Sequence, residues 1–323
     1  MNFKNCILVL ACEPNSVFLE IFFKSLKKVN TRNPLVLIGS LKILKFQMKK
    51  LSFKKKIKIL DLNNLKNYKL NNSFINLINV DYNYQITFGK ITKKSNNYIE
   101  KCFNTAFKII RENRIKKIIN GPINKKTFLN KKFLGITEYI SSKFSIKKNC
   151  MLIYNKNLSV CPITTHLPLK DVSKKISKQK IIEKAKLIYT FYEKNLDIRP
   201  RIAILGLNPH CESMDKFNED QKIIKPAVNY LKRKKYNVSG PFSADTMFLK
   251  DNRYKFDVII GMYHDQVLTP LKTIFEYDAI NITLGLPFLR ISPDHGPNEK
   301  MLGKNISNPT SLIKAINFLD KLD

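Results

Sequence analysis

Residues 256–272 read FDVIIGMYHDQVLTPLK, in which an apolar run passes directly into a polar motif. The run FDVIIG (256–261) has the length and the branched and aromatic side chains of a buried β-strand. The polar motif that follows contains His264, one of only four histidines in the chain. The stretch therefore predicts a strand whose carboxyl end carries a histidine to the edge of a sheet.

Apolar runs of the same kind recur along the chain. Eight more are predicted as strands, at 6–11, 34–39, 57–60, 116–121, 150–155, 158–163, 201–206 and 279–285. Between many of them lie stretches of helical period, which predict helices over 16–29, 98–112, 178–195 and 221–232. This alternation is typical of an α/β fold with a sizeable, partly parallel sheet. The segment 61–97 is rich in asparagine and too weakly patterned for a prediction.

Length and composition indicate a globular protein. A chain of 323 residues is long enough to bury a core in one large or two modest domains. No apolar run reaches the roughly 18 to 20 residues of a membrane span. The apolar run 6–12 is short for a secretion signal and is followed at once by Glu13 and Pro14, which favours a first strand. The six cysteines form no C-x-x-C pair, which favours free thiols and a cytoplasmic location.

The charge of the chain is strongly positive. There are 58 Lys and Arg against 25 Asp and Glu, a formal net charge of +33. A clustered basic face would indicate nucleic-acid binding by counterion release. Here the basic residues are spread along the whole chain, with short runs such as 54–56 and 232–235, and no zinc-finger spacing or aromatic RNA-binding motif accompanies them. We therefore expect a solvated basic surface and no specific nucleic-acid partner.

Polar motifs follow four of the predicted strands: NGPINKK (120–126), TTHLPLK (164–170), GLNPHCE (206–212) and GMYHDQ (261–266). Because ligands of open α/β sheets collect at the carboxyl ends of strands, these motifs indicate one shared site.

Three of the four motifs contain a histidine, namely His166, His210 and His264. A lone histidine is more often structural or exposed than a ligand. Three at equivalent positions indicate a metal site with an open position, the arrangement of catalytic zinc. The separations of 44 and 54 residues form no short metal motif, so spacing alone is weak evidence.

The order of these motifs carries a resemblance to a known family. NGPINKK, TEYI, TTHLPL, GLNPH, GPFSADTMF, YHDQVLTPLK, INITLGLPFLR and DHG resemble the 4-hydroxythreonine-4-phosphate dehydrogenase family of pyridoxal phosphate biosynthesis. The resemblance runs from about residue 115 to the C-terminus and is fainter before it. It implies an α/β fold like that of isocitrate and isopropylmalate dehydrogenases, with two domains and a cleft between them. The implied domains are 1–125 plus 255–323, and 126–254 with the interface of a homodimer whose active sites are built by both subunits.

The resemblance also implies a reaction. A small phosphorylated substrate, 4-phosphooxy-L-threonine, is oxidised at its secondary alcohol with NAD or NADP and then loses CO2, which gives 3-amino-2-oxopropyl phosphate. The family's metal ligands match His166, His210 and His264. One divalent ion per site is implied, and three imidazoles accept Zn, Co or Mn, and Mg less naturally.

Further residues match the family's site. Its substrate-binding positions correspond to Ile136, Thr137, Lys272, Asn281 and Arg290. A lysine point charge, an amide and a guanidinium fork suit a phosphate and a carboxylate. Without the resemblance, Lys272 would be one more surface lysine.

The remaining candidates have less definite roles. Asp265 is a candidate for orienting a metal ligand or balancing charge. Asp245 is a candidate acid/base or site-lining carboxylate, with a helix cap as the structural alternative. Asn208 and His295 are candidates for cofactor binding, and His295 could equally be structural. Asn124 and Lys125 are candidates for lining the same cleft.

The chain also departs from the family pattern. Ile136 replaces a substrate-binding histidine, while Thr137 is kept. The segment CEPNSVFLE (12–20) lacks the glycines of the family's N-terminal motif, which removes freedom for positive φ. A glycine is missing after NPHC (208–211), and 297–299 replace small residues. These departures concern turnover and cofactor affinity more than the fold.

Three functions are compatible with the sequence. The first is the vitamin B6 dehydrogenase just described. A second is a dehydrogenase of another phosphorylated four-carbon hydroxy acid, such as a phosphothreonate, which would fit the loss of a histidine at Ile136. A third is a catalytically weakened basic protein retained for binding.

Overall fold

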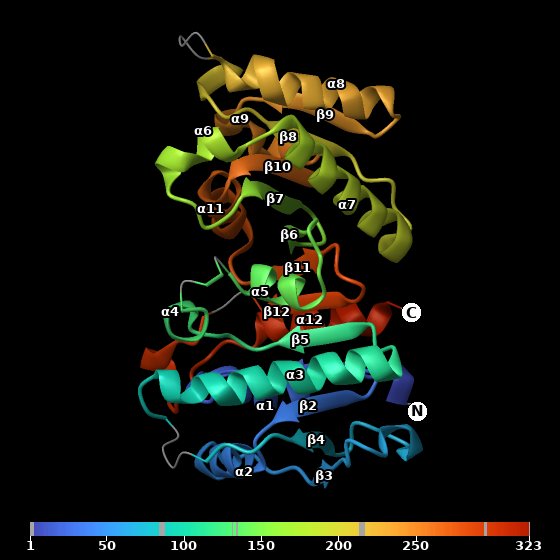
Figure 1. The fold of residues 1–323 in the computed structure, drawn as a ribbon, viewed down its shortest axis with the longest axis vertical. Coiled ribbons are helices and arrows are strands. Elements are labelled where there is room, and N and C mark those ends of the chain that lie inside the picture. Colours follow the sequence, from blue (N-terminus) through green and yellow to red (C-terminus); the bar gives the residue numbers. More distant parts are fainter. Residues whose placement is uncertain are drawn as a thin grey trace. The chain divides into compact units, whose positions relative to one another are not determined.

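The computed structural model describes residues 3–83, 88–130, 132–133, 135–212, 217–293 and 296–322. Contacts divide the chain into two compact units. The terminal unit comprises the residues up to Ile136 together with those from Pro287 onward. The middle unit comprises Thr137–Leu286. Each unit has its own set of strands and covering helices (Figure 1).

The terminal unit contains parallel strands in the order β3-β4-β2-β1-β5-β12. These strands are β1 (Ile7–Leu10), β2 (Leu35–Gly39), β3 (Ile57–Ile59), β4 (Ile75–Asn79), β5 (Lys117–Asn120) and β12 (Leu289–Pro293). The helices are α1 (Phe18–Leu26), α2 (Leu41–Lys50), α3 (Asn96–Asn113), α4 (Lys125–Phe128) and α12 (Thr310–Lys321).

The core of the terminal unit forms around β1, whose four residues are all apolar and buried. Such continuous apolar strands occur where a parallel sheet is covered by helices. On α3 the buried residues recur every three or four positions, for example Tyr98, Cys102 and Ala106. This helix packs on β1 and β2, as Figure 1 shows, and α12 packs on β1, β5 and β12.

The middle unit contains strands in the order β11-β6-β7-β10-β8-β9. The pairs β11/β6 and β6/β7 are antiparallel, and β7/β10, β10/β8 and β8/β9 are parallel. The strands are β6 (Cys150–Tyr154), β7 (Ser159–Thr164), β8 (Ile202–Leu205), β9 (Val238–Phe242), β10 (Val258–Tyr263) and β11 (Ile280–Leu284). The helices are α5 (Ile136–Lys143), α6 (Val172–Lys175), α7 (Lys178–Leu196), α8 (Lys225–Arg233), α9 (Ala244–Met247), α10 (Lys250–Arg253) and α11 (His264–Phe275).

Helix α11 matters most for the site because it begins at His264. Its buried residues Val267, Leu268 and Leu271 join a core cluster with residues of β7 and β10, including Val160 and Ile259. Burial of such side chains contributes about 1.5–3 kcal/mol each. The first turn of α11 is therefore held firmly against the end of β10.

The predicted α/β class is confirmed, and each of the nine predicted strands coincides with an observed one. Three observed strands have no counterpart in the prediction. β4 lies inside the asparagine-rich segment. Its Asn76 can be buried because the side-chain amide donates to the carbonyl oxygens of Leu35 and Asn71. β9 contains a Gly-Pro pair and β12 contains an arginine and ends in a proline, so neither shows a strand pattern.

The partition into units differs from the expected domain boundaries. The expectation places residues 255–286 with the terminal segments, whereas contacts group them with the middle unit. The reason is strand pairing, since β10 lies between β7 and β8 and β11 pairs with β6.

All six cysteines are free thiols. Five of them are buried. Cys12, in the segment without the family's glycines, nevertheless has a φ of 53°. This left-handed conformation costs a non-glycine residue roughly 1–2 kcal/mol. Among the described residues, no helix has the length and apolar character needed to cross a membrane.

Gly285, at the end of β11, is predicted to be intolerant of any side chain. Its φ is +94°, and a Cβ there would clash with the backbone carbonyl oxygen of Lys148. Positive-φ strain costs roughly 1–3 kcal/mol, and overpacking costs roughly 1–3 kcal/mol more. We expect Gly285→Ala to lower the urea midpoint clearly. The control is Gly296→Ala, where the nearest atom to a Cβ would be Asn298 Oδ1 at 3.9 Å, and an equal effect in both variants would contradict the prediction.

Candidate metal and substrate site

The three histidine motifs lie at the carboxyl ends of three neighbouring strands. β10 lies between β7 and β8 and is parallel to both, with Tyr263 in register with Thr164 and Ile260 in register with Ile204. His264 is the first residue after β10, and His166 lies two residues beyond β7. His210 lies in the short helical turn η5 (Pro209–Cys211) that follows β8. Three parts of the chain that are distant in sequence thus meet at one edge of the middle unit.

Side chains tie these strand ends together. Thr164 Oγ1 donates to the carbonyl oxygen of Met262 at 2.7 Å, which joins β7 to β10. Gln266 Nε2 donates to the carbonyl oxygen of Gly206 at 2.8 Å, which joins α11 to the end of β8. The same Gln266 accepts from the backbone N–H of Met262 at 2.6 Å. Gln266 was not among the predicted site residues, although it belongs to the HDQ motif beside His264.

His166 and His264 are close to each other. Their ring centroids are 5.9 Å apart and the rings are inclined by 37°. His264 Nδ1 lies 2.7 Å from Asp265 Oδ1. Because an ionised carboxylate only accepts hydrogen bonds, Nδ1 carries the proton in this contact. In this tautomer Nε2 is the nitrogen left to bind a metal.

The backbone is unusual at two of the three histidines. His166 has a φ of 56° and His210 a φ of 54°, and Cys211 follows with 62°. The left-handed region is uncommon for residues other than glycine, and it costs roughly 1–2 kcal/mol per residue. Residues held in such conformations cluster at functional sites. Other described residues outside the site, such as Ser52 and Asp197, share this conformation, so positive φ supports a functional role of these loops only together with their position at the strand ends.

Asp245 lies in the first turn of α9, and its carboxyl interacts electrostatically with the imidazole of His210. The hydrogen bond from Ser243 Oγ, 2.7 Å long, holds the pKa of the Asp245 carboxyl below its usual value, and the backbone N–H of Thr246 and the His210 imidazole act in the same direction. The carboxyl is exposed. It is therefore ionised at neutral pH, and its contact with Thr246 also makes it part of the local turn.

The three imidazoles suit a divalent ion, although the described residues do not bring them together around one point. Within the part of the chain that the structure describes, no three His, Cys, Asp or Glu side chains are grouped closely enough to hold a metal. Two imidazoles adjoin, and the third lies by Asp245. His166 and His210 are exposed, so their imidazoles are accessible to an ion from solvent. Neutral imidazoles at an open edge fit the chemistry of Zn and its neighbours.

Thr137 and Asn281 lie near one face of β11. Thr137 is buried, and its Oγ1 is 3.4 Å from Oγ1 of Thr283, two residues along the strand from Asn281. Asn281 Oδ1 is buried with no hydrogen-bond partner among the described residues. A buried acceptor of this kind requires an explanation, and a ligand donor is one. Lys272 is exposed on α11, eight residues beyond His264, which corresponds to about 12 Å along a helix.

The other candidates lie in the terminal unit. Arg290 on β12 is fully buried, and its Nε donates to Asn120 Oδ1 at 2.6 Å. Ile136 is half-buried at the start of α5. Asn124 caps α4 by accepting from the backbone N–H groups of Lys126 and Thr127, and Lys125 is exposed. His295 lies outside the described residues.

Asn208, a candidate for cofactor binding, is engaged within the protein. Its Nδ2 donates to Asp220 Oδ2 at 2.9 Å and to Glu219 Oε2 at 3.2 Å. Its amide nitrogen therefore holds the loop after β8 against Glu219 and Asp220.

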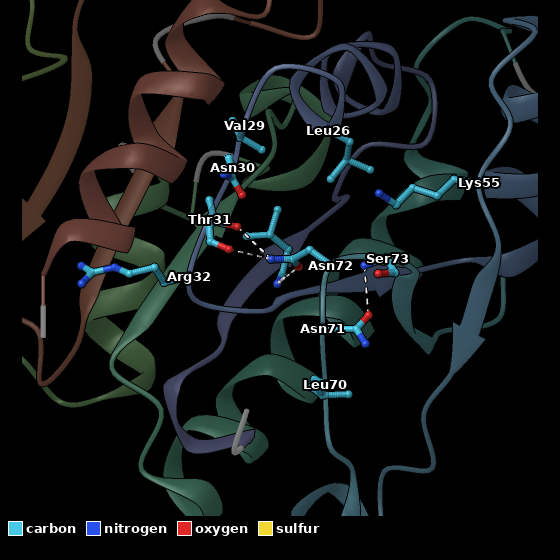
Figure 2. Close-up of a pocket in the computed structure, with 11 residues that line it drawn as sticks. Leu26, Val29, Asn30, Thr31, Arg32, Lys55, Leu70, Asn71, Asn72 and Ser73 are labelled. Atoms are coloured by element: carbon cyan, nitrogen blue, oxygen red, sulfur yellow. Dashed lines mark hydrogen bonds between the residues drawn. The ribbon is translucent and has the colours of Figure 1, made fainter.

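A cavity of about 450 Å³ lies elsewhere, in the terminal unit. Figure 2 shows it between the loop after α1 and the segment before β4, which includes Asn72. It opens at the amino ends of β2 and β4, whereas ligands of α/β sheets bind at the carboxyl ends. The Asn72 amide is already bonded to Thr31, Asn33 and Leu35. This cavity is therefore separate from the candidate site.

Known proteins match the chain over nearly its full length. The family model described as "Pyridoxal phosphate biosynthetic protein PdxA" matches residues 30–319. A 4-hydroxythreonine-4-phosphate dehydrogenase of Sulfurihydrogenibium sp. (strain YO3AOP1) is 40% identical over 313 residues, which cover 94% of either chain. The crystal structure of the Klebsiella pneumoniae 4-hydroxythreonine-4-phosphate dehydrogenase has a TM-score of 0.83 at 26% identity, covering 97% of this chain and 98% of that one. A putative enzyme of the same name from Salmonella typhimurium has a TM-score of 0.85 at 26% identity, covering 98% of both chains. The chain therefore belongs to the PdxA family and is a dehydrogenase of that family.

Proposed function

We propose that this dehydrogenase oxidises 4-phosphooxy-L-threonine with NAD or NADP and a divalent metal, and that the product loses CO2 to give 3-amino-2-oxopropyl phosphate. The observation that supports this most is the placement of His166, His210 and His264 at the ends of three adjacent strands. That edge is where α/β proteins bind their ligands.

The three histidines would hold the metal. A divalent ion bound by them would supply a Lewis acid for an oxygen of the substrate, and a nicotinamide cofactor would supply the hydride acceptor. The contact of Asp265 with Nδ1 of His264 would orient the ring and leave Nε2 to bind the metal. Asp245, whose pKa is lowered chiefly by Ser243, is a poor proton acceptor and suits charge balance beside His210.

Substrate binding would fall to Thr137, Asn281, Lys272 and Arg290. Asn281 Oδ1 offers a buried acceptor without a partner in the described structure, which suits an N–H or O–H donor of the substrate. Lysine and arginine suit its phosphate and carboxylate.

We further propose a homodimer in which both subunits contribute to each active site, with the interface on the middle unit. In such an arrangement the imidazoles of one chain need not converge by themselves, which agrees with the spacing described above. A cytoplasmic location would suit the six free thiols.

A spectrophotometric assay tests the proposal directly. NADH formation is measured with 4-phosphooxy-L-threonine and with a phosphothreonate, before and after treatment with a chelator. We expect turnover of the first substrate, loss of turnover with chelator, and recovery on adding Zn, Co or Mn. Activity that survives complete metal removal would contradict the metal assignment.

The second candidate substrate is a phosphothreonate. Ile136 favours it, because an apolar, half-buried side chain replaces an imidazole that could bond an anionic part of the substrate. Faster turnover of the phosphothreonate in the assay above would select this alternative.

Restoring the imidazole at position 136 is predicted to improve the enzyme. A hydrogen bond to a charged group is worth roughly 1.5–3 kcal/mol, equivalent to about 10- to 150-fold in kcat/KM. Because Thr137 and nearby lysines such as Lys125 and Lys126 could compensate in part, Ile136→His should raise kcat/KM by less than this factor, mostly through KM. Ile136→Leu is the matched control. Unchanged or poorer kinetics in a folded Ile136→His protein would show that the pocket is built around isoleucine.

A further inference from the structure

Asp220 is a fully buried acidic residue in the middle unit. It begins the π-helical turn η6 (Asp220–Ile224), and its exposure is 0%. Aspartate is almost never buried to this extent unless its carboxylate is bound by donors. The donors bound to the Asp220 carboxylate therefore indicate which part of the chain this residue holds in place.

Among the described residues, the donors to this carboxylate come from the loop that leads to His210. Asp220 Oδ1 accepts from the backbone N–H of Leu207 at 2.8 Å. Oδ2 accepts from the backbone N–H of Asn208 at 3.1 Å and from its Nδ2 at 2.9 Å. These two residues are separated from His210 only by Pro209. Because bonds to an ionised carboxylate are stronger than neutral ones, the backbone just before His210 is firmly restrained.

The surrounding packing leaves this carboxylate little freedom. A Cβ on Gly206 would lie 2.6 Å from Asp220 Oδ1 and 2.7 Å from Cys211 Sγ. Only glycine therefore permits the loop to close around the carboxylate. The carbonyl oxygen of Gly206 also accepts the Gln266 hydrogen bond that connects this loop to α11.

The restrained loop has an unusual backbone. His210 and Cys211 are consecutive left-handed residues. Histidine enters the left-handed region more readily than most residues, but two such residues in succession still cost free energy, which contacts from elsewhere in the fold offset. Three such contacts come from Asp220. Its carboxylate binds the backbone N–H groups of Leu207 and Asn208 and the Asn208 side chain, just before His210 in the sequence.

We propose that Asp220 is a positioning residue that holds the His210 loop in the conformation in which the imidazole can bind a divalent metal. The inference rests on the metal site of the proposed function. Asp220 acts through the backbone and not as a ligand, since its own carboxylate is buried while His210 is exposed.

The experiment measures Co²⁺ binding, by affinity and by the visible absorption of the bound ion, which reports coordination geometry. Asp220→Asn keeps the size of the side chain but replaces one accepting oxygen by a donor. Asp257→Asn is the matched control, because Asp257 also accepts a backbone N–H, from Arg201 at 2.7 Å, just before β10 begins. We expect Asp220→Asn to weaken Co²⁺ binding by about 10- to 100-fold, the usual effect of residues that support metal ligands, and to alter the absorption bands. Asp257→Asn should bind Co²⁺ as the native protein does.

A second variant, Asn218→Ala, tests the same proposal if the Asp220→Asn protein does not fold. Asn218 Oδ1 accepts from the backbone N–H groups of Asp220 and Gln221 at 2.9 and 3.2 Å, so it holds the turn that carries the carboxylate. Asn218→Ala should weaken Co²⁺ binding several-fold in a folded protein. A purely structural role would lower the urea midpoint of these variants and leave Co²⁺ affinity and absorption unchanged, which would overturn the inference. If the native protein itself binds no Co²⁺, the metal site of the proposed function fails, and the inference fails with it.

Discussion

Replacing His264 by alanine is expected to remove the bound metal and to lower kcat/KM by about 1,000-fold or more. A Lewis-acidic ion contributes several kcal/mol to stabilising the charge that develops in such a reaction, and each 1.36 kcal/mol is about tenfold in rate. His264 begins α11, whose buried face is anchored by Val267 and Leu271, and its own side chain is only partly buried. The substitution should therefore leave the fold intact.

The measurement combines metal content with NADH formation for His166→Ala, His210→Ala and His264→Ala. Each variant should lose metal and chelator-sensitive activity while its urea midpoint stays near the native value. Lys170→Ala, an exposed change in the same motif as His166, is the control and should keep both. Stoichiometric metal and normal turnover in all three histidine variants would refute the ligand assignment.

The second large effect is expected at Arg290. Its guanidinium is fully buried and donates from Nε to Asn120 Oδ1 at 2.6 Å. Lysine keeps the charge but lacks the planar fork that binds a phosphate or carboxylate through two bonds. The loss of one charge-assisted bond is worth roughly 1.5–3 kcal/mol. We therefore expect Arg290→Lys to raise KM for the phosphorylated substrate by about 10- to 150-fold.

A control variant distinguishes a role of Arg290 in substrate binding from a role in stabilising the fold. Asn120→Ala removes the same internal hydrogen bond but leaves the guanidinium in place. It should lower the urea midpoint, since a buried donor loses its acceptor, and change KM much less than Arg290→Lys does. If Arg290→Lys lowers the urea midpoint but leaves KM unchanged, Arg290 serves the fold alone.

Much of the fold could be predicted because its strands are local patterns. The run 6–11 is apolar without interruption, and in 256–261 only Asp257, just before β10, breaks the pattern. Burial in a parallel sheet demands such apolar runs. The strands β4, β9 and β12 were not predicted because their asparagine, glycine-proline and arginine residues interrupt the strand pattern, and the contacts that accommodate such residues depend on the fold. Asn76, for example, is tolerated inside β4 only because Leu35 and Asn71 present carbonyl oxygens to it.

The division of the chain was harder to predict for the same reason. Residues 255–286 join the middle unit because β10 inserts between β7 and β8 and β11 pairs with β6. Strand pairing between segments this distant in sequence leaves no trace in local periodicity.

The sequence by itself determined the class of fold, the family motifs and the three histidines, since strand patterns and residue types are properties of short segments. Only the tertiary structure decided that these histidines follow three adjacent strands, that His166 and His264 adjoin, and that Arg290 is buried against Asn120. It alone showed that Gln266 and Asp220 hold the histidine loops. The physical reason is that a hydrogen bond between distant segments forms only when the packed chain brings its donor and acceptor together. The residues next to either partner in the sequence do not determine this.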